Sequence, residues 1–515
     1  MSSRHVENLA DRIWKLSERN GPAFGSQQFI PASTYNNHNI INENTVRSEL
    51  GLAKGEDERL VNFSLGPAVK TFLIHLDLGW DVNTTRQHMV NFMQTGFNDG
   101  MLPVTLDFCN ASPAFRSKAW SPASRHNFCK GQWPYLAPVV TEKTSMLTLD
   151  MEPLPFLQIR ESARSGGSSY VHQIRVHKDH LKLGNSPQTH SSATDIAVKE
   201  TPGPFHSHFT TEATTLLALR PLNHPNIIPC LAAISKMDKY YLLFPWATGG
   251  TLLNLQSRLE IDPLSLPLSD LRLLISQTLR QFRGILDALH HIHKMGFRHG
   301  DIKPENILVF QDGRSKTGIW KLADFGAATR RADSSGSGGR RRETESRVEY
   351  STVRYEPPEA GAPGGVIREG DVWSLGAVML ECAIWLMYGD GEVMRFVREM
   401  GGVGAAFYVM GEREARMHPV VTDWLGHMKR DVEGQGTALG EVLGLVEGWM
   451  LTMVGSKSEG RGSPKDLVRM MDGIIAKTEH KRTGGEFLFR GVGMTKGRKR
   501  HGDKGPQRAP SGSRY

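Results

Sequence analysis

The sequence predicts an α+β protein that has a helical N-terminal extension, a small β-rich lobe and a large helical lobe. Strand-like segments, in which apolar residues alternate with polar ones, lie between residues 152 and 248. From residue 249 to residue 478 the apolar residues mostly follow a helical period, most clearly across Ile275–Leu289. A shorter helical pattern lies earlier in the chain, within residues 64–151. The order of these three regions gives the predicted architecture.

The extension has two parts of different character. Residues 1–63 are polar and rich in asparagine, with no apolar period, so we expect this segment to be mostly disordered. In residues 64–151, Gly79 separates two helical patterns, and the second ends before Gly96. The aromatic-rich segment Phe128–Pro138 is expected to pack against something larger.

The small lobe is predicted to span residues 152–248. Its expected strands are Phe156–Ile159, Val171–Val176, Ile196–Lys199 and Tyr240–Phe244. The first two are joined by Arg164–Ser169, and the polar insertion His177–Asp195 should loop out. A helix is predicted at Thr211–Leu222, where the sequence N-H-P-N stops it.

In the large lobe, Gly296 ends the long helix that contains Ile275–Leu289. Two short strands then follow, with a hairpin-like turn at Gln311–Gly318 between them. The low-complexity segment Ser334–Ser346 is expected to be mobile. A mostly apolar helix begins near Asp371, and further helical patterns continue towards the end of the lobe.

Composition indicates a soluble globular protein, with 39% hydrophobic and 23% charged residues among 515. Four cysteines without a C-x-x-C pair fit a reducing compartment and argue against a disulfide framework. The first residues show no apolar signal segment, so we expect an intracellular protein, cytoplasmic or nuclear. The longest apolar run, Leu375–Met387, is too short to span a bilayer.

The positive charge is concentrated at the C-terminus. Residues 480–515 hold ten of the 62 Lys and Arg but only two of the 54 acidic residues, and the remainder is balanced at 52 of each. We therefore expect residues 479–515 to be a basic, disordered tail. Its Lys496–Arg500 cluster is either solvated or a contact for an acidic partner or an import receptor.

The residues best suited to catalysis are concentrated in one segment, residues 298–310, with the sequence R-H-G-D-I-K-P-E-N-I-L-V-F. Within it, Asp301 supplies a carboxylate that can orient an attacking hydroxyl, and Lys303 supplies a cation for a moving phosphate. Asn306 and Asp324, the latter in K-L-A-D-F-G, are oxygen ligands suited to magnesium. These residues predict a phosphoryl-transfer site.

The two motifs together resemble the catalytic and metal loops of eukaryotic protein kinases. The resemblance covers roughly residues 156–477, and K-P-E-N is the serine/threonine form of the loop. Finer features are similar to a group of kinase-like proteins common in filamentous fungi. They include V-H-Q-I-R-V-H-K-D-H, L-L-F-P-W-A-T-G-G, Y-E-P-P-E, Q-W-P-Y-L-A-P and F-N-D-G-M-L-P, which extend the likeness to about residue 65.

The resemblance implies an ATP site. Lys199, at the end of I-A-V-K, would contact the phosphates, and Glu212 is the candidate for its helix partner. Counting back from N-H-P-N places Thr215 at the usual glutamate position, so either Arg220-Pro221 is a local insertion or the ion pair is missing. Pro245 and Ala247 would meet adenine through the main chain, with Phe244 at the back of the pocket. Only the middle glycine of the usual phosphate loop remains, Gly166, with Gly167 beside it.

The resemblance also implies supporting contacts. Glu359 would pair with Arg461, Asp371 would hold the catalytic-loop backbone, and Thr352 would contact the base and the lysine. His299-Gly300-Asp301 departs from the usual H-R-D, and the missing arginine normally receives the activation-loop phosphate.

These residues predict an ATP- and Mg²⁺-dependent kinase that transfers phosphate to serine or threonine of a protein substrate. Two alternatives stay open. The degenerate glycine loop fits a pseudokinase that acts as a scaffold, and H-G-D also occurs in small-molecule phosphotransferases.

Overall fold

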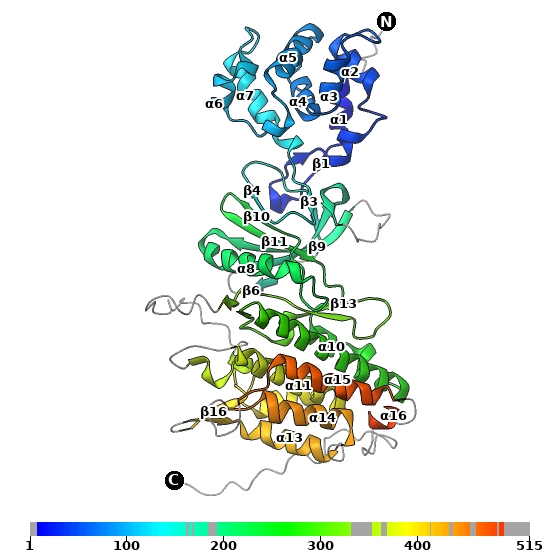
Figure 1. The fold of residues 1–515 in the computed structure, drawn as a ribbon, viewed down its shortest axis with the longest axis vertical. Helices are drawn as coiled ribbons and strands as arrows, with labels where there is room; N and C mark the ends of the chain where they lie inside the picture. Colours follow the sequence, from blue (N-terminus) through cyan, green and yellow to red (C-terminus); the bar gives the residue numbers. More distant parts are fainter. Residues whose placement is uncertain are drawn as a thin grey trace. The chain divides into compact units, whose positions relative to one another are not determined.

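A computed structural model describes residues 8–160, 164–166, 169–183, 193–330, 353–361, 368–411, 414–431, 436–453, 460–480 and 484–488. The chain divides into two compact units (Figure 1). The first holds residues 1–204 and 231–244, and the second holds residues 205–230 and 245–515. The predictions for Ser334–Ser346 and Lys496–Arg500 lie outside the described residues.

Seven helices lie in the described part of the N-terminal extension: α1 (Leu9–Trp14), α2 (Glu43–Leu50), α3 (Glu58–Leu65), α4 (Val69–Leu76), α5 (Val82–Thr95), α6 (Leu106–Ala111) and α7 (Pro122–Gly131). The predicted disorder of residues 1–63 is therefore wrong for residues 8–63. Asparagines in this segment serve as helix caps, since Asn8 caps α1 and Asn42 forms a capping box with Thr45 at the start of α2. Val46 and Leu60 are fully buried in the extension's core.

Among its described residues, the first unit also contains a seven-stranded sheet, in the order β4-β10-β11-β9-β7-β5, with β6 on β7. Its strands are β4 (Met146–Leu149), β5 (Phe156–Ile159), β6 (Arg164–Gly166), β7 (Ser169–His177), β9 (Ala193–Pro202), β10 (Ala232–Lys236) and β11 (Lys239–Pro245). The mixed α/β architecture and the four predicted strands are confirmed. The linker predicted at Arg164–Ser169 instead contains β6, whose Gly166 is opposite Ser169.

The extension joins the sheet at both edges. β4 pairs in parallel with β10 at one edge, with Met146 opposite Ala233. At the other edge, the N–H of Gly21 donates to the carbonyl of Phe156 over 2.9 Å, and the ring of Phe24 meets that of Phe156 edge-on at 5.1 Å. Because the sheet gains backbone pairing and buried aromatic area from the extension, the two form one folding unit.

The insertion predicted to loop out at His177–Asp195 is partly structured. Its first residues form a turn and β8 (Leu181–Lys182), which pairs with β3 (Val140–Thr141) of the extension. His180 is buried there, and its Nε2 accepts the N–H of Ala32 at 3.1 Å while its Nδ1 donates to the carbonyl of Pro138 at 2.9 Å. Residues 184–192 lie outside the described residues.

A buried histidine pair lies within the extension. Nε2 of His75 and Nδ1 of His88 are 2.8 Å apart, and the rings of Trp80 and Trp120 surround them. Burial, with a smaller contribution from His88, lowers the pKa of His75 to about 3. Burial also lowers the pKa of His88 to about 4, although the charge of Asp81 acts in the other direction. Both imidazoles are therefore neutral in the folded protein at neutral pH.

This pair predicts that the extension loses stability in mild acid. The folded pKa values lie below the unfolded value near 6.5, so their contribution is complete above about pH 6.5 and is lost as the pH falls towards 4. Each histidine should cost about 1.4 kcal/mol per pH unit below 6.5. Thermal unfolding followed by tryptophan fluorescence between pH 7.5 and 5.5 measures the loss. His88→Gln should flatten the pH dependence, whereas replacing the exposed His126 should leave it unchanged, and equal slopes in both variants would contradict the assignment.

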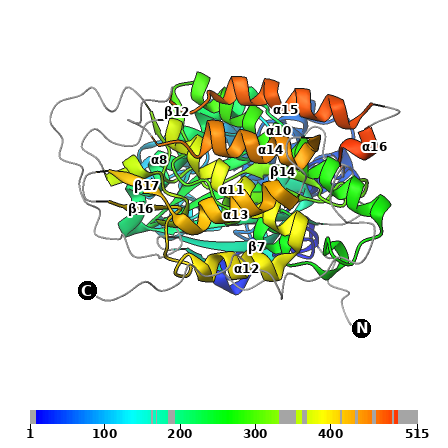
Figure 2. The ribbon, with the colours of Figure 1, turned by 90° about the horizontal axis from the view of Figure 1, so that it is seen from below.

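The second unit is mainly helical, with nine described helices. They are α8 (His206–Leu219), α9 (Leu252–Gln256), α10 (Leu268–Lys294), α11 (Glu369–Tyr388), α12 (Asp390–Glu399), α13 (Pro419–Asp431), α14 (Ala438–Leu445), α15 (Pro464–Thr478) and α16 (Gly484–Phe487). Three antiparallel pairs accompany them: β12 (Phe297–Arg298) with β15 (Thr329–Arg330), β13 (Ile307–Phe310) with β14 (Ile319–Leu322), and β16 (Tyr408–Met410) with β17 (Ala415–Met417). Figure 2 shows α15 lying along α10 and α14.

The apolar helix α11 is longer than the apolar run suggested. Among the described residues it alone is long and apolar enough to cross a membrane, but its apolar window is entirely buried in the protein. Its acidic residue Glu381 is buried too, and accepts the hydroxyl of Tyr355 at 2.7 Å. The helix therefore serves as the core of the second unit.

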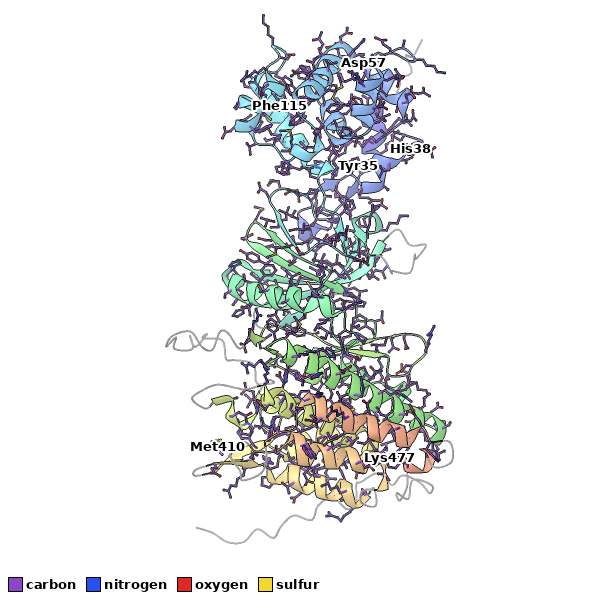
Figure 3. The ribbon with its side chains drawn as sticks, in the orientation of Figure 1. Tyr35, His38, Asp57, Phe115, Met410 and Lys477 are labelled. Carbon is purple, nitrogen blue, oxygen red and sulfur yellow. The ribbon has the colours of Figure 1, made fainter. Side chains whose placement is uncertain are left out.

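The predicted disordered tail begins too early. Residues 484–487 form α16, and Leu488 is buried. Lys477 of α15, labelled in Figure 3, stands 5.6 Å from the ring centre of Phe487. This cation–π contact and the burial of Leu488 explain why the segment folds against α15 despite its basic composition.

Candidate active site

The catalytic-loop residues are held by a buried carboxylate. Oδ2 of Asp371 accepts the N–H of His299, and Oδ1 accepts the N–H of Gly300, each at 2.8 Å. Oδ2 also lies 2.8 Å from Nε2 of His293, in the last turn of α10. Burial alone would raise the pKa of Asp371, but the hydrogen bond and charge of His293 outweigh it and lower the pKa. The predicted role of Asp371 is thus confirmed.

The sequence analysis missed two supporting residues. The role of His293 could not be predicted, because nothing in its local sequence shows that it faces Asp371, which lies 78 residues later. The buried ring of Phe325 lies 4.8 Å from the ring of His299, whose Nε2 bonds to the carbonyl of Ala323 at 3.1 Å. These contacts fix the catalytic loop against the strand that precedes Asp324.

Three predicted site residues meet at one point. The Nδ2 group of Asn306 donates to the carbonyl of Asp301 at 2.8 Å and to its Oδ2 at 2.9 Å. Nζ of Lys303 lies 3.0 Å from the same Oδ2. Among the described residues, nothing hydrogen-bonds to Oδ1 of Asp301. That oxygen is therefore left for a hydroxyl outside the protein.

The lysine carries a firmly held positive charge. Burial by itself would lower the pKa of Lys303, but the attraction of Asp301 and of two further carboxylates, Glu305 and Asp324, outweighs burial and raises it. Lys303 therefore stays protonated across the neutral range and can face a phosphate.

The candidate metal ligands have suitable donor atoms. Because Nδ2 of Asn306 is committed to Asp301, its Oδ1 is the group left for a cation, and no described residue donates to it. Asp324 is exposed and has a φ of +62°, a left-handed backbone that aspartate tolerates better than most residues. The N–H of Gly326 lies 3.4 Å from its Oδ1. An amide oxygen and an exposed carboxylate fit a hard divalent cation.

Glu212 faces the same loop from α8. It is only 3% exposed, and a Cβ added to Gly326 would lie 3.7 Å from its Oε2. Thr215, the position that the counting from N-H-P-N favoured, instead returns its hydroxyl to the carbonyl of Thr211 at 2.9 Å. Within the second unit, Glu212 therefore places its carboxylate beside the Asp324 loop, and Thr215 does not face that loop with a carboxylate.

This placement predicts unequal effects on phosphotransfer from two neighbouring substitutions. Glu212→Gln should lower the rate about tenfold or more, because it removes a buried charge at the site. Thr215→Ala is the matched control and should stay within about twofold, since its hydroxyl only meets its own helix. Steady-state kinetics with ATP as the varied substrate tests both. Equal losses in the two variants would contradict the assignment.

The remaining predicted residues lie in several places. Lys199 is on β9, half-buried and opposite Val171 on β7, and Gly166 ends β6. Pro245 ends β11. The carbonyl of Ala247 accepts the N–H of Gly250 at 2.9 Å, so this residue is part of a turn. Gly167 and Thr352 lie outside the described residues.

Residues 190–410 match the model of the protein kinase domain family. The chain contains a protein kinase domain. It is 31% identical over 176 residues to the serine/threonine-protein kinase PKH3 of Eremothecium gossypii, a match that covers 34% of this chain and 22% of the relative. It is also 32% identical over 162 residues to mouse mitogen-activated protein kinase kinase kinase 1, covering 32% of this chain and 10% of that protein. The chain thus spans a minor part of the length of these relatives.

The second unit contains the predicted ion pair, which joins distant segments of the chain. Both guanidinium ends of Arg461 reach Glu359, with Nη2 donating to Oε2 at 2.9 Å. The guanidinium also stands 4.9 Å from the ring centre of Trp373, and Nη1 donates to the carbonyl of Glu369. The predicted pairing of Glu359 with Arg461 is confirmed.

Gly300 of the kinase domain has a conformation that the sequence did not reveal. Its φ is +84°, and a Cβ at this position would lie 2.7 Å from the carbonyl oxygen of Ala327. A side chain would be strained here whatever its charge. Glycine at position 300 therefore lets the loop adopt this left-handed conformation without the strain that a side chain would bring.

We predict that Gly300→Arg lowers kinase activity about tenfold or more, because the loop must give up its present path to accept a Cβ. Gly300→Ala is the matched control for strain without charge and should lose a similar amount. Phosphatase treatment of the unmodified protein should leave activity within about tenfold, since no arginine at this position awaits a phosphate. The prediction would be contradicted by a Gly300→Arg variant that is active and loses activity on phosphatase treatment, because the loop would then accept an arginine that responds to phosphorylation.

A second cluster of metal-ligand types lies elsewhere in the kinase domain, formed by His224, Asp287 and His291. Its hydrogen bonds assign it another role. Nδ1 of His224 accepts the N–H of Asn226 at 3.1 Å, so its proton lies on Nε2, facing Asp287. Nδ1 of His291 donates to the carbonyl of Asp287, whose Oδ2 also accepts from Arg283. The nitrogens that face the carboxylate thus carry protons, and the cluster ties α10 to the N-H-P-N turn.

Proposed function

We propose that this chain is an ATP-dependent serine/threonine kinase that acts on proteins, with Mg²⁺ as its metal. The observation that carries the proposal is that the two oxygens of the Asp301 carboxylate have different surroundings. Its Oδ2 is held by Asn306 and Lys303, while its Oδ1 accepts no bond from the described residues. A carboxylate fixed at one oxygen and open at the other is suited to orient a hydroxyl and to take its proton.

The charges around this carboxylate support phosphoryl transfer in particular. Lys303 is a protonated cation beside Asp301, and it can neutralise charge on a transferring phosphoryl group. Asn306 and Asp324 would hold Mg²⁺ through their oxygen atoms, and the bound ion would offset negative charge on the phosphates of ATP. Lys199 is the candidate for holding those phosphates in place, and Glu212 is the candidate partner that would orient this lysine.

The acceptor class rests on the sequence of the loop and on the relatives. K-P-E-N is the serine/threonine form of the catalytic loop, and PKH3 is named as a serine/threonine-protein kinase. The degenerate glycine loop favours a lower rate than usual, since it keeps only Gly166 of the three usual glycines. A weakly active enzyme is therefore expected.

The test is a phosphotransfer assay with labelled ATP on the purified full chain. Acceptors are the protein itself, a generic basic protein, and matched peptides that carry serine, threonine or tyrosine. We expect Mg²⁺-dependent labelling of serine or threonine. Asp324→Ala, which removes a metal ligand, should abolish both the labelling and the Mg²⁺-dependent part of ATP binding.

Two results would contradict this proposal in different ways. Mg-ATP binding without transfer to any acceptor would favour the pseudokinase alternative. Transfer to a small amino or hydroxyl compound but not to proteins would favour a small-molecule phosphotransferase.

A further inference from the structure

We propose that Cys109 and Cys129 of the N-terminal extension form a peroxide-sensitive thiol pair that closes into a reversible disulfide. The proposal concerns a modification site in the first unit and does not depend on the kinase activity of the second. It rests on the distance between the two sulfurs, on how they are held, and on their unequal exposure.

The two sulfurs are in contact. Sγ of Cys109, on α6, lies 3.4 Å from Sγ of Cys129, on α7. Figure 1 shows these helices side by side, and Phe115, labelled in Figure 3, lies in the segment that joins them. A disulfide has a sulfur separation of about 2.05 Å, so closure requires a movement of roughly 1.4 Å, which the two side chains can share.

The backbone around the pair is fixed by a buried amide. Nε2 of Gln132 donates to the carbonyls of Cys129 and Val104, and its Oε1 accepts the N–H of Val104, each at 2.8 Å. Gln132 thereby ties the end of α7 to the residues just before α6. The cysteines are therefore held near each other by the fold, and their contact does not depend on two freely moving side chains.

The two thiols differ in the way that a reactive and a resolving cysteine differ. Cys109 is fully buried, whereas Cys129 is partly exposed and can meet a small oxidant. The hydrogen bond from Cys109 lowers the pKa of the Cys129 thiol, against the effect of burial. The contact with Cys129 and burial raise the pKa of the Cys109 thiol. Arg125, which is held on the carbonyl of Phe115 at 3.0 Å, acts on Cys109 in the other direction through its positive charge.

The step balances with hydrogen peroxide as the oxidant. The thiolate of Cys129 attacks one peroxide oxygen, the O–O bond breaks, and a sulfenic acid and hydroxide form. The sulfur of Cys109 then attacks the sulfenic sulfur, so that the S–S bond forms and the S–O bond breaks. The leaving hydroxide takes the thiol proton as water. The two sulfurs lose two electrons, and peroxide becomes two waters; an added dithiol reverses the change by exchange.

Two other cysteines provide an internal comparison. Cys230 and Cys382 are both buried, so a dissolved oxidant has little access to them. Burial raises the pKa of the Cys382 thiol, with Glu381 adding to the rise. The same oxidant should therefore leave these two thiols unchanged.

The experiment uses the purified full chain, reduced and then exposed to graded hydrogen peroxide. Free thiols are blocked with N-ethylmaleimide under denaturing conditions, and tryptic peptides are analysed by mass spectrometry. Trypsin cleaves after Arg116, Lys118 and Arg125, so a disulfide would join two separate peptides. We expect this linked pair of peptides to form at low peroxide and to disappear with dithiothreitol. Cys230 and Cys382 should stay reduced and should therefore be found alkylated by N-ethylmaleimide.

Variants sharpen the test. Cys109→Ser should stop the reaction at the sulfenic acid of Cys129, which a dimedone probe captures, and Cys129→Ser should abolish both products. Cys382→Ala is the matched control and should keep the linked peptide. The proposal is overturned if the native protein accumulates sulfinic acid at Cys129 without the link. It is equally overturned if the link forms only after unfolding, or if Cys109→Ser traps no more sulfenic acid than the unmodified protein.

Discussion

Replacing Asp301 by asparagine is expected to reduce phosphotransfer by about 10²–10⁴-fold, the usual contribution of a positioned base. Asparagine keeps the shape of the side chain and the contact with Asn306. It loses the charge that pairs with Lys303 and the oxygen that can take a proton from the acceptor hydroxyl. ATP affinity should change little, because Asp301 acts on the acceptor and not on the nucleotide. Rates and ATP binding, measured on the same preparation, test both statements.

A matched control for this substitution is Asp270→Asn. Asp270 is partly exposed on α10 and pairs with Lys316. Asp270→Asn therefore removes the same charge as Asp301→Asn, but at a residue that pairs outside the catalytic loop. Its activity should equal that of the unmodified protein. If Asp301→Asn retains more than about a tenth of the activity, Asp301 is not the group that orients the hydroxyl.

Removing residues 1–151 is expected to leave a chain without a stable first unit. The deletion takes away β4, which covers the edge of β10, and Phe24, which packs on Phe156. An uncovered edge strand and an exposed apolar core favour aggregation. Expression of residues 152–515 should give little soluble protein, and thermal unfolding of what remains should lack the cooperative transition of the full chain.

Two further variants separate loss of the extension from loss of chain length. A chain that starts at Asn8 should fold like the full protein, because all of the described contacts between the extension and the sheet come from residues 8–151. Phe24→Ala in the full chain should lower the free energy of unfolding by about 3 kcal/mol, the usual cost of truncating a buried phenylalanine. A stable, soluble fragment of residues 152–515 would show that the extension is an independent domain.

Local patterns in the sequence predicted much of the catalytic loop. Asp301 and Asn306 are five residues apart on one turn, so their meeting requires only the local loop geometry that the motif specifies. The hairpin of β13 and β14 follows from two short apolar segments around a turn. The period of α10 likewise follows from its own apolar positions.

Contacts between distant segments could not be predicted in this way. The sequence predicted disorder for residues 8–63 because composition does not distinguish an asparagine that caps a helix from one that is exposed to solvent. Only the buried partners of Val46 and Leu60 distinguish them. The parallel pairing of Met146 with Ala233 leaves no periodic signal either, since pairing in register depends on the whole sheet.

The sequence by itself determined the two-lobed α+β class, the kinase resemblance and the identity of the catalytic loop, because these depend on short-range period and spacing. The tertiary structure alone decided three further features. It showed the positive φ of Gly300, the position of Glu212 beside the Asp324 loop, and the contact of Cys109 with Cys129. Each depends on where a second segment lies in space, and the packing of many residues sets that position.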